Sequence, residues 1–145
     1  MKTKEIAVIV LAAGASTRLG RPKQNLLVQD QTLLERICHT SMELDNSSVV
    51  VVIGANTTLK APVGTTVVVN EEWQEGMASS IRCGMQHLLA SLPTIELVIL
   101  TVCDQPFIRV ELFKEMIAVH EQTNLPIVAC TYADSIGTPV LFHHS

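Results

Sequence analysis

Short apolar runs alternate along this chain with segments whose apolar residues recur at helical spacing. An uninterrupted apolar run bounded by turn-forming residues is typical of a strand that is buried on both faces. Such runs predict buried strands at residues 6–11, 49–53 and 97–102, and further strands are expected at residues 66–69, 126–130 and 139–142. Apolar residues three and four positions apart predict helices at residues 32–43, 78–90 and 110–121.

This alternation predicts the fold class. Strands that alternate with helices form a mostly parallel sheet, and right-handed crossovers place the helices on both of its faces. We therefore expect a three-layer α/β/α sandwich with a Rossmann-like sheet. The strongly hydrophobic segments at residues 6–11 and 97–102 are expected to be central neighbours in that sheet.

Composition narrows the class of protein. The 145 residues are expected to form one domain, residues 1–145, and an apolar content of 48% with 3% aromatics predicts an aliphatic core. A net charge of −4 disfavours binding to nucleic acid. No run reaches the roughly 18 apolar residues of a membrane span. Four cysteines without CxxC spacing indicate reduced thiols in a cytoplasmic protein.

The loop after the first predicted strand carries the strongest chemical signal. Its small residues are accompanied by Arg18, Arg21 and Lys23, and no acidic residue occurs between Ile6 and Gln29. Exposed backbone N–H groups and uncompensated cations suit the binding of phosphate. The spacing matches neither a Walker A loop nor a dinucleotide-binding fingerprint. The alternative is a surface turn with incidental cations.

Four ordered segments carry a family resemblance. They are residues 11–23 (LAAGASTRLGRPK), 76–84 (GMASSIRCG), 102–107 (VCDQPF) and 137–142 (GTPVLF). Together they resemble the MobA-like NTP transferases, and more narrowly the molybdenum cofactor cytidylyltransferases and their relatives in xanthine dehydrogenase maturation. The resemblance implies the nucleotide-diphospho-sugar transferase type of sheet.

The resemblance also implies a set of site residues. Arg18 and Lys23 are expected to be catalytic, because positioned cations stabilise the charge that develops on a triphosphate. Arg21 is as well explained by a solvated side chain. The residues expected to bind the nucleotide are Leu11, Ala12, Ala13, Gly14, Arg18, Lys23, Asn70, Gly76 and Ser80.

A metal site is expected at Asp104, directly after the predicted strand at residues 97–102. A triphosphate needs Mg²⁺, which binds carboxylate and phosphate oxygens, and the resemblance makes Asp104 its ligand. The alternative role is a helix cap. For Ser79 and Ser80, the alternative to nucleotide binding is likewise capping of the helix predicted at residues 78–90. Arg82 is expected to be a solvated or structural charge that could reach a second substrate.

The resemblance implies transfer of CMP from CTP to molybdopterin, with a molybdenum hydroxylase such as xanthine dehydrogenase as a partner. Ala13 resembles the cytidylyl branch, where the guanylyl branch has glycine. Transfer of GMP, transfer to a sugar or polyol phosphate, and a maturation factor without turnover remain open. The resembling domain extends beyond Ser145, so a fragment and a naturally short chain are both consistent with the sequence.

Overall fold

The computed structural model describes residues 5–13, 27–28, 31–54, 61–103, 105, 108–132 and 135–143. Within these ranges one six-stranded sheet is formed, in the order β5-β4-β1-β6-β8-β7. Its strands are β1 (Ile6–Ala12), β4 (Ser47–Ile53), β5 (Thr65–Val69), β6 (Leu97–Val102), β7 (Ile127–Tyr132) and β8 (Ser135–His143).

The strand directions confirm a mostly parallel sheet. Strand β1 pairs in parallel with β4 on one side and with β6 on the other, and β4 pairs in parallel with β5. Strand β8 runs antiparallel to both β6 and β7. The predicted central position of β1 and β6 is confirmed, because neither lies at an edge. The carboxyl ends of β1, β4, β5 and β6 therefore meet at one edge of the sheet.

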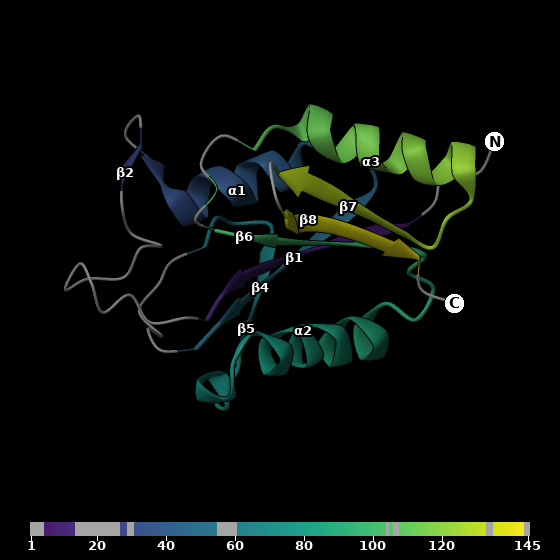
Figure 1. Cartoon of the computed structure of the whole chain (residues 1–145). Helices are drawn as coiled ribbons and strands as arrows, with labels where there is room; N and C mark the ends of the chain where they lie inside the picture. The colour runs from purple at the N-terminus through teal and green to yellow at the C-terminus, as the bar shows by residue number, and fades with distance from the viewer. Residues whose placement is uncertain are drawn as a thin grey trace.

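Helices cover both faces of the sheet, as predicted. Helices α1 (Leu33–Met42) and α3 (Val110–Thr123) lie on one face and α2 (Met77–Ser91) lies on the other (Figure 1). Helix α1 begins with a capping box, in which Thr32 accepts from the Glu35 N–H and the Glu35 carboxylate accepts from the Thr32 N–H. A two-stranded ribbon, β2 (Leu27–Val28) with β3 (Gln31–Thr32), precedes α1 and was not predicted.

Two layers of apolar side chains, one on each face of the sheet, join the helices to the sheet. Alternate residues of β1 point to opposite faces, so Val8 and Val10 pack toward α1 and α3 while Ile9 packs toward α2. Gly84 allows α2 to approach the sheet closely, because a Cβ there would lie 3.1 Å from methyl carbons of Ile9 and Val52. The core is aliphatic apart from the fully buried Phe113, as the composition predicted.

Candidate functional site

A pocket of about 230 Å³ opens at the carboxyl edge of the sheet. It lies between the end of β1, the 3₁₀ helix η2 (Trp73–Glu75) and the start of α2. Its walls are formed by Leu11, Ala13, Trp73, Gly76, Met77 and Ser80. The pocket therefore brings together predicted nucleotide-binding residues from two segments that lie far apart in the sequence.

The end of β1 presents only part of the first motif to this pocket. Leu11 and Ala13 line the pocket and belong to the apolar layer under α2. Ala12 packs into the opposite layer, toward α1 and α3, so its side chain faces away. A contact between Ala12 and a ligand would have to come from its backbone.

The charged groups expected at this edge lie outside the described residues. These are Arg18, Arg21 and Lys23 of the first motif, together with Asp104; Gly14 is also outside. Their roles stay predictions. No group of three His, Cys, Asp or Glu side chains within the described part of the chain is arranged to hold a metal ion.

Asn70 anchors two serines at the start of α2. It follows β5 directly and is 5% exposed, and its Nδ2 donates to the hydroxyl oxygens of Ser79 at 2.9 Å and Ser80 at 3.0 Å. Its Oδ1 accepts from the Glu72 N–H at 3.0 Å. The amide of Asn70 therefore fixes Ser80 at the wall of the pocket. Its direct contact with a nucleotide stays a prediction.

The helix-capping alternative for the two serines is wrong. Helix α2 begins at Met77, earlier than predicted, and its N-cap is Gly76, which makes no side-chain cap. The Ser79 hydroxyl lies 2.9 Å from the Glu72 carbonyl and 3.0 Å from the Gly76 carbonyl, to which it donates. Gly76 has a φ of 108°, a left-handed conformation that favours glycine. The uncapped amino end of α2 thus faces the pocket.

Two further contacts connect the other motifs to this edge. The Cys103 N–H donates to the Leu11 carbonyl at 3.4 Å, which joins the chain after β6 to the end of β1. Gln105 Nε2 donates to the Thr138 carbonyl, and the Thr138 hydroxyl donates to Gln105 Oε1, both at 3.2 Å. Members of all four motifs are therefore linked at the carboxyl edge of the sheet.

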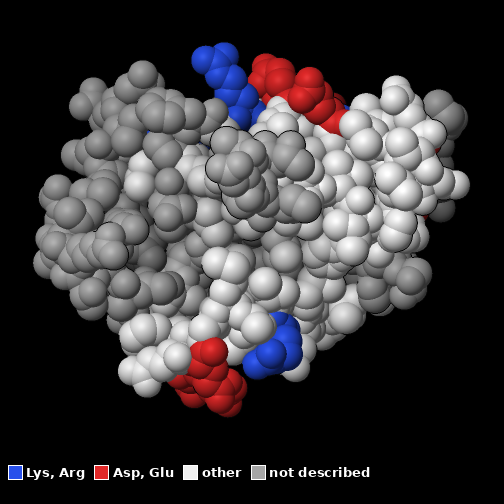
Figure 2. Space-filling model, in the orientation of Figure 1, with Lys and Arg blue, Asp and Glu red and all other residues white. Residues whose placement is uncertain are grey.

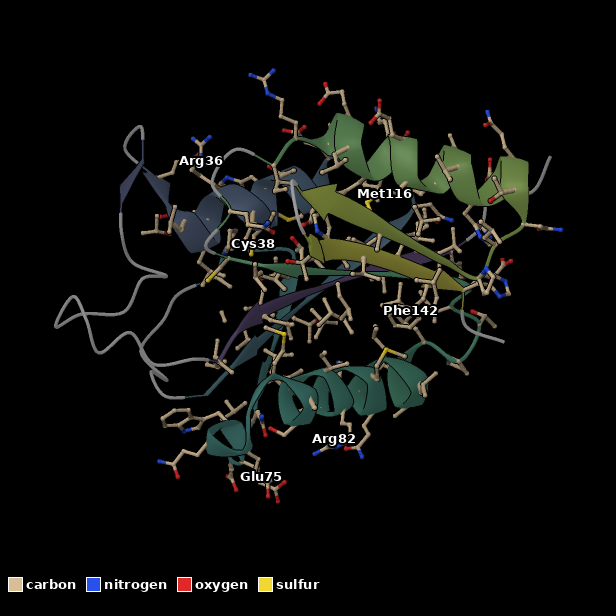
Figure 3. All side chains as sticks on the ribbon, viewed as in Figure 1. Arg36, Cys38, Glu75, Arg82, Met116 and Phe142 are labelled. Atoms are coloured by element: carbon tan, nitrogen blue, oxygen red, sulfur yellow. The ribbon has the colours of Figure 1, made fainter. Side chains whose placement is uncertain are left out.

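The charges near α2 lie away from this pocket. Arg82 and Glu75 are both about 60% exposed and form an ion pair at 3.9 Å on the outer side of the helix (Figure 3). On the face drawn in Figure 2, described charges gather beside α3 and at the start of α2. Arg82 is thus a solvated charge, as expected, and an exposed pair of this kind adds little stability.

Three of the four cysteine thiols, those of Cys38, Cys83 and Cys130, have a raised pKa. Burial, and secondarily the Glu35 carboxylate, raise the pKa of Cys38 to about 12. Burial also raises the pKa of Cys130, while burial and then the Glu72 carboxylate raise the pKa of Cys83. A thiol with a raised pKa is a poor nucleophile at neutral pH.

Sequence reasoning missed Trp73 and Gly54. Trp73 lines the pocket beside Met77, a member of the second motif, and Gly54 packs against Trp73. A signal was present for Trp73, because it is the one tryptophan of the chain and lies three residues before the second motif. No sequence pattern indicated the contact with Gly54, which joins residues from two separate strand ends.

The sequence of this chain is similar to those of several known proteins. The family model described as "MobA-like NTP transferase domain" matches residues 8–145. The chain is 31% identical to Nicotine blue oxidoreductase of Paenarthrobacter nicotinovorans, over 88% of this chain and 63% of that protein. It is 28% identical to the bifunctional protein GlmU of Corynebacterium jeikeium, over 91% of this chain. The chain spans only about 29% of the length of that GlmU.

Solved structures agree with the family match. The structure of Rv0371c from Mycobacterium tuberculosis H37Rv superposes with a TM-score of 0.82 at 31% identity, covering 99% of this chain and 73% of that one. A manganese complex of Rv0371c gives a TM-score of 0.74 at 28% identity, with 98% and 72% covered. Molybdopterin-guanine dinucleotide biosynthesis protein A from Archaeoglobus fulgidus shares the fold, with a TM-score of 0.67 at 14% identity, covering 94% of this chain and 67% of that chain.

Proposed function

Because this chain belongs to the MobA-like NTP transferase domain family, we propose that it transfers CMP from CTP to a molybdopterin-type molybdenum cofactor. The observation that carries the proposal is the pocket shared by Leu11 and Ala13 with Gly76 and Ser80. Ligands bind at the carboxyl ends of strands in open α/β sheets, and this pocket lies there. The described members of the four motifs lie at the same edge.

The groups around the pocket support nucleotide binding. The uncapped start of α2 offers backbone N–H groups and the positive end of the helix dipole. Ser80 accepts a hydrogen bond from Asn70, and its own proton has no acceptor in the part of the chain that the structure describes. That proton can be donated to a polar atom of a ligand in the pocket. The first motif then supplies Arg18 and Lys23 for the phosphates.

The proposed reaction is a direct displacement. The terminal phosphate oxygen of the acceptor attacks the α-phosphorus of CTP, the bond to the β-phosphate breaks, and pyrophosphate leaves. Negative charge grows on the leaving oxygens, where Arg18 and Lys23 would neutralise it. The raised pKa of the Cys38, Cys83 and Cys130 thiols makes these three side chains poor nucleophiles, which fits a direct displacement.

A divalent metal would be held by Asp104. Strand β6 ends at Val102, and the Cys103 N–H is hydrogen-bonded to the Leu11 carbonyl, where the first motif begins. Asp104 is the next residue in the sequence. A carboxylate suits Mg²⁺ together with phosphate oxygens, and the related Rv0371c forms a complex with manganese. When bound, such an ion neutralises charge on the triphosphate.

A second candidate is a maturation factor that binds a nucleotide or cofactor without transferring it. Its support is the similarity to a protein named as an oxidoreductase, since the same kind of domain there carries a name other than transferase. A molybdenum hydroxylase such as xanthine dehydrogenase would be its partner. Transfer of GMP, or transfer to a sugar or polyol phosphate, is the alternative within the enzyme class. For any of these we propose the cytoplasm, where the four free cysteines would stay reduced.

One experiment separates these candidates. The protein is incubated with Mg²⁺, molybdopterin and either CTP, GTP or ATP, and pyrophosphate release is followed. Release that needs both CTP and molybdopterin supports the cytidylyltransferase. Release that needs GTP supports the guanylyl alternative, and release with a sugar phosphate in place of molybdopterin supports the other transferases. Binding of a nucleotide without release of pyrophosphate under any condition supports the maturation factor.

A further inference from the structure

Trp73 occupies a distinctive place in the pocket. It opens the 3₁₀ helix η2, which ends directly before Gly76, the N-cap of α2. Its side chain packs on the apolar layer under α2 and also forms a wall of the pocket that Leu11 and Ala13 line. The indole therefore lies between the protein core and the space where a ligand can bind.

Gly54 makes this position of the indole possible. A Cβ at Gly54 would lie 2.5 Å from Trp73 Cβ, 2.8 Å from Trp73 Cγ and 3.0 Å from the Ala13 carbonyl oxygen. Real Cβ atoms do not approach other atoms so closely, so any side chain at residue 54 would displace Trp73. Gly54 follows β4 immediately, and no positive φ requires glycine there. The need for glycine comes from the close approach of Trp73.

The chemistry of the walls defines what the pocket can accept. Leu11, Ala13, Trp73 and Met77 are apolar, and Ser80 supplies one hydroxyl. No charged side chain of the described residues lines the pocket. Its volume of about 230 Å³ is below the roughly 300 Å³ at which pockets for drug-sized ligands begin. These properties suit a flat, uncharged ring rather than a phosphate group.

We propose that Trp73 stacks on the nucleobase of the bound nucleoside triphosphate and that Gly54 sets the position of the indole for this contact. The inference rests on the proposed function and adds a binding residue to it. Stacking on an aromatic side chain tolerates every base, because each base has a π-face. Trp73 therefore contributes affinity for the base without choosing between CTP and GTP, and that choice falls to other groups of the pocket.

The test uses the intrinsic fluorescence of Trp73, the one tryptophan of the chain. Full-length protein is titrated with CTP, with GTP and with inorganic tripolyphosphate, and binding is measured in parallel by calorimetry. We expect both nucleotides to change the fluorescence on binding, and tripolyphosphate to bind with a smaller change. Binding of both nucleotides without a change in fluorescence overturns the inference.

Variants make the test quantitative. Trp73→Ala is expected to lower the affinity for CTP and for GTP about tenfold or more, by similar factors. The affinity for tripolyphosphate should stay nearly unchanged. Trp73→Phe keeps an aromatic face and should retain most of the affinity. Gly54→Ala should lower the affinity for both nucleotides, because its Cβ would displace the indole. Equal nucleotide affinity in Trp73→Ala and the wild type contradicts the proposal, and thermal melting checks that each variant is folded.

A reporter at the other end of the sheet is the matched control. Leu125 is 54% exposed and lies next to the start of β7, at the edge opposite the pocket. Leu125→Trp in the Trp73→Phe background should give no fluorescence change with nucleotide. If neither CTP nor GTP binds the wild type by calorimetry, the proposed function itself fails. If they bind but Trp73→Ala binds them equally well, only the stacking inference fails.

Discussion

The side chain of Gln105 exchanges two hydrogen bonds with Thr138, one to its carbonyl oxygen and one from its hydroxyl, each 3.2 Å long. Gln105 belongs to the segment after β6, and Thr138 lies in β8, the strand antiparallel to β6. The two bonds hold the third motif against the fourth. Residues 33 positions apart in sequence are thus fixed at one end of the sheet.

This relationship gives a first prediction. Gln105→Ala and Thr138→Val should each lower the free energy of unfolding by about 1 kcal/mol, because each removes part of the same hydrogen-bonded pair. The double variant should cost less than the sum of the two, since both variants break one interaction. Urea denaturation of the four proteins of this cycle gives the coupling. Strict additivity would show that the bond from the Thr138 hydroxyl to Gln105 Oε1 contributes nothing to stability.

A second prediction concerns Asn70. Asn70→Ala removes the amide group that donates to the Ser79 and Ser80 hydroxyl oxygens. It also leaves the Glu72 N–H without its side-chain acceptor. We expect a loss of about 2–4 kcal/mol in the free energy of unfolding, because buried polar groups lose their partners. Nucleotide affinity should fall as well, since Ser80 is no longer held at the pocket.

Asn70→Asp is the matched variant for this residue. A carboxylate keeps the acceptor for Glu72, and the two serine hydroxyls can turn to donate to it. Its loss of stability should be smaller than that of Asn70→Ala. Gln122→Ala, on the exposed surface of α3, should leave both stability and nucleotide affinity unchanged. Equal stability of Asn70→Ala and the wild type would refute the anchoring role.

Much of the fold could be predicted because burial leaves a strong trace in sequence. Residues 6–11 are apolar throughout and residues 97–102 are apolar except for Thr101, and a strand covered on both faces requires such a composition. The direction of β8 could not be predicted, since an apolar run such as residues 139–142 does not encode direction. The 3₁₀ helix at Trp73 is too short to show a period. The sequence therefore predicts the positions of the main strands and helices, but not the direction of β8 or the short 3₁₀ helix between β5 and α2.

The candidate site was only partly predictable for a related reason. Motifs name residues that touch ligands, so Leu11, Ala13, Gly76 and Ser80 could be expected from the sequence, and the structure brings them together. The contact of Gly54 with Trp73 depends on the approach of two strand ends in space. Such a contact has no local pattern. The positions of Lys23 and Asp104 relative to the pocket stay predictions, because both lie outside the described residues.

A third prediction tests Lys23. The attraction between the Lys23 ammonium group and the leaving pyrophosphate is proposed to grow as the pyrophosphate becomes more negative. Lys23→Ala should therefore lower kcat by about 10²-fold, with a smaller effect on nucleotide affinity. Steady-state kinetics with pyrophosphate detection measures both quantities. Lys114→Ala, a solvent-exposed change on α3, is the control with the same loss of charge. Normal turnover in Lys23→Ala would show that this assignment is wrong.

A fourth prediction tests Asp104. Asp104→Asn keeps the size of the side chain and removes the charge that a divalent ion needs. We expect metal-dependent turnover to be lost. The midpoint of thermal unfolding should change no more than it does for an ordinary surface substitution. Binding of Mn²⁺ in the presence of nucleotide, followed by electron paramagnetic resonance, gives a readout that does not depend on turnover. Wild-type Mn²⁺ affinity in this variant would contradict the ligand role.

The last prediction concerns the choice of nucleotide. Ala13 lines the pocket, is 5% exposed and has its carbonyl 3.0 Å from the position that a Cβ on Gly54 would take. Its methyl narrows the space beside the proposed base, and a pyrimidine needs less of that space than a purine. The methyl should favour CTP over GTP by roughly 1–3 kcal/mol, the range for one such group in an apolar pocket. Ala13→Gly should therefore relax the preference for CTP without reversing it. Competition titrations against a fluorescent nucleotide measure both proteins. Displacement by GTP at a lower concentration than CTP in the wild type would reject the cytidylyl interpretation in favour of the guanylyl one.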